Sequence, residues 1–559
     1  MYTKKNIILS FIALHRGIIF CALLFGFLSI LATVLVPVFL GKFYQLALHT
    51  HSARGGIFDK IFGNISDIGT YFLFFATLLL VKFIFNYFEK YFSGISGELF
   101  SKDVREQLFE KQINSRLNVF ERKDTGAYLL RYGGDLSSIQ NYLTKGIIAF
   151  INDCLFLIIA IAIFFIIHPQ LALIIIISFP LIFISILFIN KNLKKINKKR
   201  RNIRSVNLSF VASRLNALLT IKVFNRENIE QEKFSKGSVN LYVQGKKYYT
   251  WQAFINALLP FLLYTMLGWV LFVAYKINND GYSPVDGSVI LIFIMLMINT
   301  MPVLRRILKV NFIWQAGDIS FKKLLLIYNA EQELKSKDQE LKIESGKIKF
   351  DKLSFKFENG IQIFKNLSFE ISENGIVLVE GVQGSGKSTL FKLLLGLYDY
   401  HEGQASIDGK EIKSISKHLL RKNVALVSDE LPLIGKTIFE AISYSRKEEK
   451  RSAAYNMLKK LGFVTQQDES ILDQPLKEGG KNISSGKKKL LLIARALLTN
   501  KKILLLDEPF SDLDTSFKTN LCNTLNQLKL KHTILVIDQD KNYSFGYDQV
   551  IQVSSVSNR

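Results

Sequence analysis

Six apolar runs, each long enough to cross a lipid bilayer, lie within the first 315 residues of this chain and severely restrict its possible folds. A membrane-spanning helix needs about 20 consecutive apolar residues, because the hydrocarbon core is about 30 Å thick and a helix rises about 1.5 Å per residue. Beyond about residue 345, charged residues recur at the density of a water-soluble domain. The sequence therefore predicts an all-α six-helix membrane domain followed by a soluble domain. The six runs are approximately 17–40, 68–87, 147–167, 171–189, 253–275 and 289–310.

Composition supports a membrane protein and argues against other classes. Hydrophobic residues make up 49% of the 559 residues, which is too many for a disordered chain. The three cysteines stand apart and form no Cys/His cluster, so neither a disulfide scaffold nor a zinc site is expected. A net charge of +25 suits nucleic acid or a membrane surface. We expect no nucleic-acid partner, because no recognition motif accompanies the charge.

The connections between the apolar runs are very unequal in length. A near-minimal turn, His168–Gln170, joins the third and fourth runs, and residues 278–287 form a short turn-rich link between the last two. By contrast, 88–146 and 190–252 are long and polar. We expect each of them to continue its flanking spans as helices that extend beyond the bilayer into the cytoplasm.

These two long connections are predicted to turn at tips near 118–128 and 217–227. The second connection is densely cationic, and such segments gather on the cytoplasmic side of membranes. Our main interpretation of its charge is a solvated face beside anionic lipid. The cations are Lys194, Lys195, Lys198, Lys199, Arg200, Arg201 and Arg204.

Lys4, Lys5 and Arg16 place the N-terminus in the cytoplasm as well. We therefore expect a multi-pass protein of the cell inner (plasma) membrane, with the N-terminus and the soluble domain cytoplasmic. Residues 6–14 are interpreted as an interfacial helix leading into an uncleaved first span, since Arg16 interrupts the apolar stretch and no small-residue cleavage site follows. No N-terminal peptidase domain is expected.

Few ionisable residues fall within the proposed spans, and they are Lys82, Asp153, Arg305 and Arg306. Charge inside a membrane is costly, so such residues usually face a cavity or a partner. The alternative is that all four lie near the interface and extend their charged ends into it.

A phosphate-binding loop identifies the chemistry of the soluble domain. It follows an apolar strand at 376–379 and precedes a helix at 390–395, which is the context such a loop requires. Its glycines let backbone N–H groups surround phosphates, Lys387 reaches the β and γ phosphates, and the Ser388 hydroxyl can ligate Mg²⁺. The loop consists of Gly381, Val382, Gln383, Gly384, Ser385, Gly386, Lys387, Ser388 and Thr389.

Two carboxylates end a second apolar strand at 503–506. Asp507 can hold Mg²⁺, directly or through water. Glu508 can polarise an attacking water as a general base. After a phosphate-binding loop, this pattern is strong evidence of nucleotide hydrolysis.

Over essentially its whole length the chain resembles the ATP-binding-cassette transporters in their exporter-type half-transporter form. The resemblance implies a membrane domain at 1–315, a linker at 316–345 and an α/β P-loop ATPase cassette at 346–559. It also implies ATP and Mg²⁺ as cofactors and a second half-transporter as partner, in a homodimer or in a heterodimer with a standard cassette. The lipid bilayer is the other expected partner, and the transported substrate is not identified by the resemblance.

The family's signature sequence resembles the segment that begins at Ser484: Ser484 and Gly486 match it, while Ser485 and Lys487 replace its first glycine and its glutamine. Because this segment begins a helix, it can hold the γ-phosphate of ATP bound to the other subunit. Residues 511–514 resemble the dimer-contact loop. The adenine-stacking aromatic of the family corresponds to Phe357, for which a strand core position is the competing interpretation.

Two positions depart from the family pattern near the γ-phosphate. The family glutamine of the loop that senses this phosphate corresponds to Asp429, which can ligate Mg²⁺ but repels phosphate. The switch histidine corresponds to Gln539, which can hydrogen-bond phosphate but carries no positive charge. We therefore expect slow hydrolysis.

Three functions compete at this stage. The leading hypothesis is ATP-driven export or flipping by a dimer. The second is an ATP-gated membrane regulator or channel, which the changes at Asp429 and Gln539 motivate and the retained Lys387 and Glu508 oppose. The third is a membrane-anchored ATPase for DNA or protein work, for which six spans are excessive.

Overall fold

The computed structural model describes residues 2–47, 67–118, 128–129, 131–279, 285–333, 343–358, 360–444, 448–464, 468–538 and 546–554, except for the side chains of 181–183, 185–191 and 478. The chain divides into two compact units. The membrane unit comprises Met1–Ile113 and Lys123–Ala330, and the cassette unit comprises Asn114–Arg122 and Glu331–Arg559.

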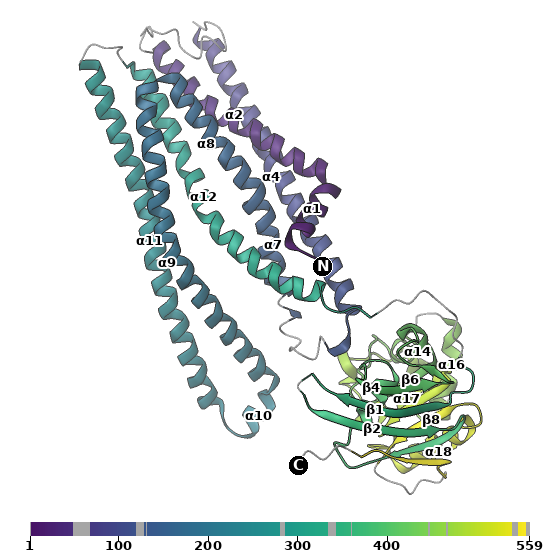
Figure 1. Cartoon of the computed structure of the whole chain (residues 1–559). Coiled ribbons are helices and arrows are strands. Elements are labelled where there is room, and N and C mark those ends of the chain that lie inside the picture. The colour runs from purple at the N-terminus through teal and green to yellow at the C-terminus, as the bar shows by residue number, and fades with distance from the viewer. Residues whose placement is uncertain are drawn as a thin grey trace. The chain divides into compact units, whose positions relative to one another are not determined.

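The membrane unit is entirely helical within its described residues, and long helices run side by side along it (Figure 1). The helices continue far beyond the apolar runs because polar sequence without helix breakers follows them. The elements are α1 (Lys4–Leu14), α2 (Arg16–Ala47), α4 (Ile68–Ile113), η1 (Arg131–Asp135), α7 (Leu136–Leu143), η2 (Thr144–Ile148), α8 (Ala149–Ile167), α9 (Pro169–Asn216), α10 (Leu218–Val223), α11 (Glu227–Asn279) and α12 (Gly287–Tyr328).

The predicted spans coincide with these helices. Among the described residues, five helices are long and apolar enough to cross a membrane, and these contain the first, second, third, fifth and sixth predicted spans. The fourth predicted span lies in α9, whose described apolar part is Pro169–Pro180. Large apolar side chains on α4, among them Phe72, Leu73 and Phe83, are exposed, as expected of helices that face lipid.

The connections also follow the sequence pattern where they are described. Helix α8 ends at Ile167 and α9 begins at Pro169, which confirms the near-minimal turn. Helices α9 and α11 form a hairpin through α10, with Lys222 and Asn225 exposed at the predicted tip (Figure 1). Most of the first predicted tip, 119–127, and the link at 280–284 lie outside the described residues. Helix α12 continues to Tyr328, into the predicted linker, because Phe321, Leu324 and Ile327 pack in a buried cluster.

Intramembrane charge has a partner in this bundle. Asp153 on α8 is buried, and its two carboxylate oxygens accept hydrogen bonds from the guanidinium of Arg306 on α12, Oδ1 from Nη2 at 2.5 Å and Oδ2 from Nε at 3.0 Å. A carboxylate held by a guanidinium in this way is a strong, orienting contact. Asp153 and Arg306 are therefore partners, as expected of charged residues within membrane spans.

The cassette unit contains two sheets. An antiparallel sheet of order β2-β1-β4-β5 consists of β1 (Ile348–Lys356), β2 (Gln362–Ile371), β4 (Glu402–Ile407) and β5 (Lys410–Glu411). A parallel sheet of order β6-β7-β8-β3-β9 consists of β3 (Gly375–Glu380), β6 (Val424–Val427), β7 (Ile503–Asp507), β8 (Thr533–Ile537) and β9 (Gln549–Gln552). The central strands β7 and β8 are almost continuously apolar, as parallel strands covered on both faces must be.

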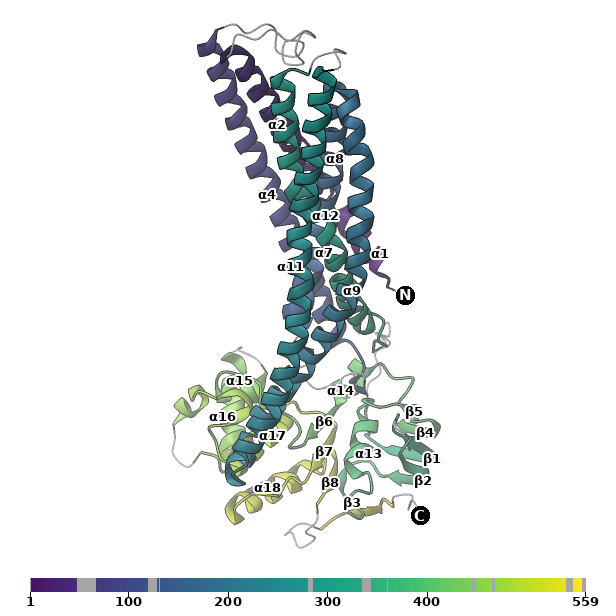
Figure 2. The same cartoon turned by 90° about the vertical axis from the view of Figure 1, so that its left-hand side faces the viewer.

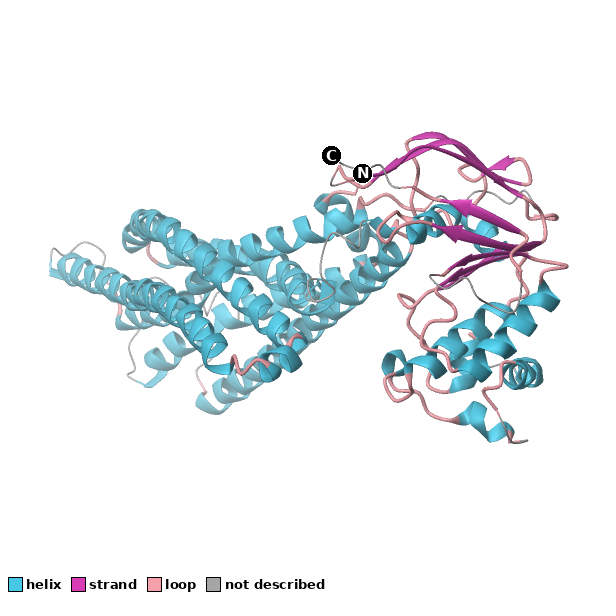
Figure 3. Ribbon diagram, turned by 90° about the horizontal axis from the view of Figure 1, so that it is seen from below, coloured by secondary structure: helices cyan, strands magenta, loops and turns pink. Residues whose placement is uncertain are grey.

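Helices cover the parallel sheet on both faces. Figure 2 shows α15, α16 and α17 on one side and the antiparallel sheet with α13 on the other, and Figure 3 shows the strands of both sheets with the helices gathered beside them. Two buried clusters, one on each side, form the core. The helices are α13 (Lys387–Leu394), α14 (Lys417–Asn423), α15 (Ile438–Ser443), α16 (Arg451–Lys460), α17 (Ser485–Leu498) and α18 (Thr515–Leu528), with short 3₁₀ turns η3 (Glu448–Lys450), η4 (Glu469–Asp473) and η5 (Glu478–Gly480).

Candidate functional site

The phosphate-binding loop lies between β3 and the N-terminus of α13, as the sequence predicted. Gly384 and Gly386 adopt positive φ angles of 83° and 94°, which favour glycine. A Cβ on Gly386 would approach the Cγ2 atom of Ile363 within 2.3 Å, so a side chain would not fit without rearrangement. The loop therefore needs glycine for both conformation and space.

Lys387, the first residue of α13, closes this loop. Its Nζ donates to the carbonyl oxygens of Gly381 at 2.7 Å and Val382 at 3.1 Å. The ammonium is thus held over the loop by backbone oxygens. Such an arrangement places a positive charge and a helix N-terminus at the same point, which favours phosphate.

Loop, strand ends and carboxylates surround one cavity of about 840 Å³. The predicted residues Gly381, Gly384, Gly386, Lys387, Ser388, Thr389, Asp507 and Glu508 all line it. Ser385 is buried beside it, with its Oγ atom 2.5 Å from where a Cβ on Gly381 would lie. The structure therefore brings the phosphate loop and both carboxylates together.

Asp507 ends β7 and receives a hydrogen bond from the Ser388 hydroxyl. Burial raises the pKa of the Asp507 carboxyl, and the nearby charges of Glu508 and Glu430 raise it further, while the Ser388 hydrogen bond opposes the shift. Two hard oxygen donors, a hydroxyl and a carboxylate, are therefore adjacent. That pair suits Mg²⁺, which takes only one or two protein ligands beside phosphate and water.

Glu508 follows in a left-handed backbone conformation, with φ of 47°. A residue other than glycine adopts this region at a cost, and surrounding contacts must hold it there. The Glu508 amide donates to the Ile537 carbonyl at 2.8 Å, which ties the turn to the end of β8. This hydrogen bond fixes the backbone from which the Glu508 side chain extends at the cavity wall.

Of the two positions that depart from the family pattern, the structure describes Asp429 but not Gln539. Asp429 follows β6, and its Oδ2 atom lies 2.7 Å from Nζ of Lys489 on α17. Gln539 lies outside the described residues. Its neighbour Asp538 lines the cavity at the end of β8.

Ser484 and Ser485 begin α17 as the signature sequence predicts. Ser484 is the N-cap, and its side chain accepts a hydrogen bond from the Lys487 amide. Gly486 lies against the predicted dimer-contact loop, because a Cβ there would be 2.6 Å from the Asp512 carbonyl oxygen. None of the three signature residues lines the cavity of the same chain.

Phe357 is placed apart from the phosphate cavity. Its ring packs against Phe355 and edge-on to Tyr398, with centroids 5.1 and 5.6 Å apart, and it is not among the cavity-lining residues. Ile363 lines the cavity instead. The contacts of Phe357, which is partly buried against a core cluster, agree with the competing interpretation of a sheet residue.

Comparison with protein-family models agrees with both units. Residues 19–301, half of the chain, match the ABC transporter transmembrane region, and residues 364–511 match the ABC transporter cassette. The chain belongs to the ABC transporters. It is an exporter-type half-transporter, with one membrane domain fused to one ATP-binding cassette, and it exports or flips its substrate at the expense of ATP.

Individual ABC transporters of known identity resemble most of the chain. The ATP-dependent lipid A-core flippase of Escherichia coli K12 is 27% identical over 482 residues, which are 85% of this chain and 82% of the relative. That of Photorhabdus laumondii is 27% identical over 507 residues, 89% and 86% of the two chains. A bacterial Atm1-family ABC exporter with ATP bound matches in fold with a TM-score of 0.81 at 19% identity, over 96% and 94% of the chains. These findings favour the transporter hypothesis over the regulator and the anchored ATPase.

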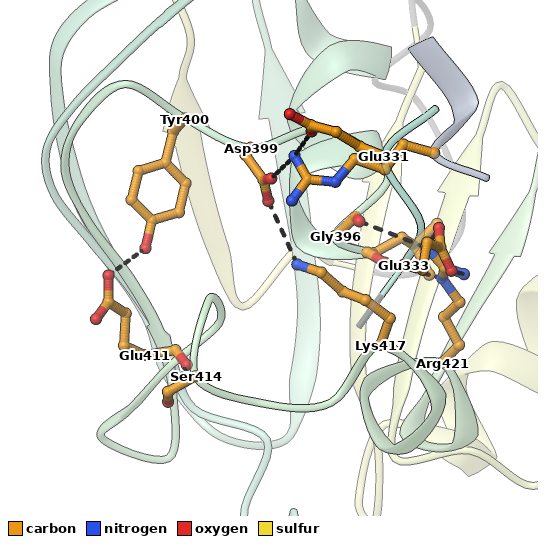
Figure 4. A network of polar contacts seen from close by, with 11 residues as sticks. Glu331, Glu333, Gly396, Asp399, Tyr400, Glu411, Ser414, Lys417 and Arg421 are labelled. Atoms are coloured by element: carbon orange, nitrogen blue, oxygen red, sulfur yellow. Dashed lines mark hydrogen bonds and ion pairs between the residues drawn. The ribbon is translucent and has the colours of Figure 1, made fainter. Parts of the chain in front are cut away.

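In this ABC transporter, the two segments that connect its units are fixed to the cassette by ion pairs (Figure 4). Arg116 contacts Glu331 at 2.9 Å and Asp399 at 2.8 Å. Arg421 on α14 binds both carboxylate oxygens of Glu333, at 2.7 and 2.8 Å. Bidentate pairs of this kind fix orientation as well as distance. Both connecting segments therefore belong to the cassette unit.

The transporter's membrane unit holds a second large cavity, of about 640 Å³, between α7, η2, α9, α11 and α12. Six cations line it: Lys145, Arg200, Arg201, Arg204, Arg305 and Lys309. The guanidinium of Arg200 lies 4.5 Å from the ring centre of Tyr248, which also lines the cavity. The described lining contains no Asp or Glu.

The sequence did not predict that the cationic run of α9 divides into exposed lysines and cavity-lining arginines. Lys194, Lys195, Lys198 and Lys199 are exposed, as a solvated face requires, whereas the three arginines that follow line the cavity. Arg305, which the sequence singled out, also lines the cavity, from α12. The change from lysine to arginine along the run was the available signal, because arginine is preferred where anions are bound. Nothing in the sequence marked Lys489.

Proposed function

We propose that this transporter moves an amphipathic substrate with an anionic phosphate or carboxylate head group, and that the cavity of the membrane unit receives that head. The supporting observation is the lining of that cavity, which has six cations and, among its described residues, no carboxylate. Cations crowded without counter-charges repel one another. A bound anion relieves that repulsion, and arginine donates to such oxygens in pairs.

The cavity also offers an apolar wall for the rest of the substrate. Leu193, Ile255, Leu259, Leu308 and Phe312 line it together with the cations. Measured from their turn-side ends, Leu259 on α11 and Arg305 on α12 lie about 30 and 27 Å along their helices. Arg200 lies about 46 Å along α9. These depths span the inner boundary of a bilayer core about 30 Å thick, where an amphiphile has its head.

Two buried polar atoms in the lining have no hydrogen-bond partner among the described residues, Nη1 of Arg200 and Oε1 of Gln252. Buried polar groups are usually satisfied. Arg200 Nη1 is a donor, and an anionic head group can accept its hydrogen bond, whereas Gln252 Oε1 is an acceptor that a hydroxyl group of the substrate can satisfy. The names of the lipid A-core flippases that resemble this chain support a lipid as the cargo.

The test uses the full chain in lipid nanodiscs and measures ATPase stimulation. Lysophosphatidic acid should stimulate at lower concentration than lysophosphatidylcholine of the same acyl chain, and glycerol phosphate should have little effect. Arg305→Gln should raise the half-stimulating concentration about tenfold, the effect of losing a hydrogen bond to a charged group. The control Lys198→Gln removes the same charge from an exposed site on α9. Equal stimulation by both lipids, or an equal effect of the control, would refute the proposal.

In the cassette we propose the following roles. Lys387 and the loop glycines hold the ATP phosphates, with Ser385 and Thr389 beside them, and Phe357 supports the adenine. Ser388 and Asp507 hold Mg²⁺, which neutralises phosphate charge. Glu508 accepts a proton from the attacking water, and Gln539 hydrogen-bonds the γ-phosphate. The lining of one cavity by the loop and both carboxylates supports this assignment.

The functional unit is proposed to be a dimer. Ser484, Ser485 and Gly486 do not line their own chain's ATP cavity, so a partner's signature is needed to complete it. We propose slow hydrolysis in a homodimer, because Gln539 supplies no positive charge. The alternative is a heterodimer in which a standard cassette contributes a faster site.

We propose that the N-terminus and the cassette are cytoplasmic and that the protein lies in the inner membrane. The exposed lysines of α9 support this orientation. Cysteines introduced at Asp124 and Lys222 should react only from the cytoplasm, and one at Pro284 only from outside. The reverse labelling pattern would overturn the topology and the direction of transport.

A further inference from the structure

A buried lysine lies behind the catalytic carboxylates. Lys489 is in the second turn of α17, and its side chain is 1% exposed. Its Nζ contacts the carboxylate of Asp429 at 2.7 Å and donates to the backbone carbonyl of Glu508 at 3.0 Å. A buried ammonium needs such partners, because removing its water is costly.

The Glu508 carbonyl that Lys489 binds belongs to a strained residue. Glu508 has φ of 47°, a conformation that persists only when its surroundings hold it. Its carbonyl oxygen also accepts hydrogen bonds from Ser511, from Oγ at 2.8 Å and from N at 3.3 Å. Lys489 and Ser511 therefore fix one peptide plane, and the direction of the Glu508 side chain depends on that plane.

The Asp429 carboxylate is 65% exposed, in contrast to the lysine that pairs with it. It follows β6, whose partner β7 ends in Asp507. Its neighbour Glu430 is bound by Lys392 of α13 at 2.7 Å. Both acidic residues of this loop are thus matched with a lysine. The repulsion of phosphate that a bare Asp429 would cause is reduced by Lys489.

We propose that Lys489 is a positioning residue for ATP hydrolysis with two separable roles. It holds the backbone of Glu508 so that the carboxylate points at the attacking water, and it neutralises Asp429 so that phosphate can approach. The inference rests on Glu508 acting as general base. The first role affects the rate of the chemical step, whereas the second affects ATP binding.

The two roles can be separated with three variants of the full chain in nanodiscs. Lys489→Met keeps length and suits a buried site, and it should lower kcat about tenfold or more, since small misplacements of a catalytic group have effects of that size. It should also raise the KM for ATP severalfold. Adding Asp429→Asn should return KM to the wild-type value while kcat stays low. Asp429→Asn alone keeps the hydrogen bond from Lys489 to the Glu508 carbonyl, so it should lower kcat far less than Lys489→Met does.

Two further variants serve as checks. Ser511→Ala removes a second donor from the same carbonyl without touching Asp429, and it should lower kcat with KM unchanged, even if Lys489→Met fails to fold. Lys460→Met removes an exposed lysine of α16 and should alter neither constant. Wild-type kcat in both Lys489→Met and Ser511→Ala would refute the positioning role.

Other outcomes also overturn the inference. Recovery of both constants in the double variant would show that Lys489 acts only as a counter-charge. Glu508→Gln is measured in parallel, because full turnover in that variant would refute the general base itself. If Glu508→Gln loses turnover while Lys489→Met keeps wild-type kcat and KM, the role of Lys489 is rejected and the general base is retained.

Discussion

The cassette and the membrane unit each contain a cavity suited to an anion, and the two are built by different means. In the cassette, backbone amides of a glycine loop, one helix N-terminus and a single lysine surround the space, and Gly384 and Gly386 are in conformations that favour glycine. In the membrane unit, six cationic side chains from three elements, η2, α9 and α12, surround a space of similar size. One cavity relies on backbone geometry and the other on accumulated charge.

This difference has consequences for selectivity. Backbone donors cannot move without unfolding the loop, so the cassette cavity suits one fixed group of atoms. Arginine and lysine side chains rotate freely and adjust to anions of several shapes. We therefore expect the cassette to be intolerant of any change in the phosphate-binding residues and the membrane cavity to tolerate changes that keep its charge.

The largest effect is expected at Lys387. Lys387→Ala should abolish ATPase and coupled transport, and Lys387→Arg should do nearly as much harm, because a guanidinium cannot occupy the point where Nζ bonds two loop carbonyls. Turnover should fall at least about a hundredfold in both, measured as phosphate release. An active Lys387→Arg would mean that this cavity also relies on charge alone, and activity in Lys387→Ala would refute the nucleotide site.

Glu508→Gln comes next. Shape is retained but the base is lost, so turnover should fall about a hundredfold or more while ATP affinity persists. We expect an ATP-trapped, closed dimer, measured by nucleotide retention after rapid desalting. Glu449→Gln, which removes an exposed carboxylate from η3, is the matched control. Wild-type turnover would exclude Glu508 as the base.

Gln539→His tests whether a side-chain charge can add to the cassette's backbone donors. A cation that acts mainly in the transition state should raise turnover by up to about a hundredfold with ATP affinity unchanged. The measurement is ATPase of the purified homodimer. No rise, with activity only after a second half-transporter is added, would favour the heterodimer. An ordinary transporter rate in the wild type would contradict the expectation of slow hydrolysis.

The smallest effect is expected from Arg305→Lys in the membrane cavity. Because charge is retained, the half-stimulating concentration of lysophosphatidic acid should change less than about twofold, against about tenfold for Arg305→Gln. Stimulation should also weaken as salt is added, since exposed charges are screened. A large effect of Arg305→Lys would show that this cavity, too, depends on exact donor geometry.

Much of this protein followed from local sequence. The spans, the turn at His168–Gln170, the hairpin tip beyond Asn216 and the phosphate loop were all predicted, because each depends on residues close together in the chain. Apolar length determines a membrane span, and glycine spacing determines a phosphate loop. Ser388 and Asp507 were each predicted as Mg²⁺ ligands from the motifs that contain them, and the structure adds the hydrogen bond between them.

Other features could not be read in this way. Arg200 and Arg305 are far apart in sequence, and the cavity they share exists only because α9 and α12 lie together. In the sequence Lys489 is one of three consecutive lysines, and only the packing of α17 makes it the buried one. Arg116 and Asp399 are likewise brought together by the fold.

The sequence by itself determined the membrane-and-cassette organisation, the ATP chemistry and the residues of the phosphate loop. Only the tertiary structure decided which cations line a cavity, which lysine neutralises Asp429 and what holds Glu508 in its strained turn. The physical reason is that helical span length and loop conformation are short-range properties of the chain. The partner of a charge is chosen by packing between distant segments, where burial makes an unpaired ion costly and a paired one specific.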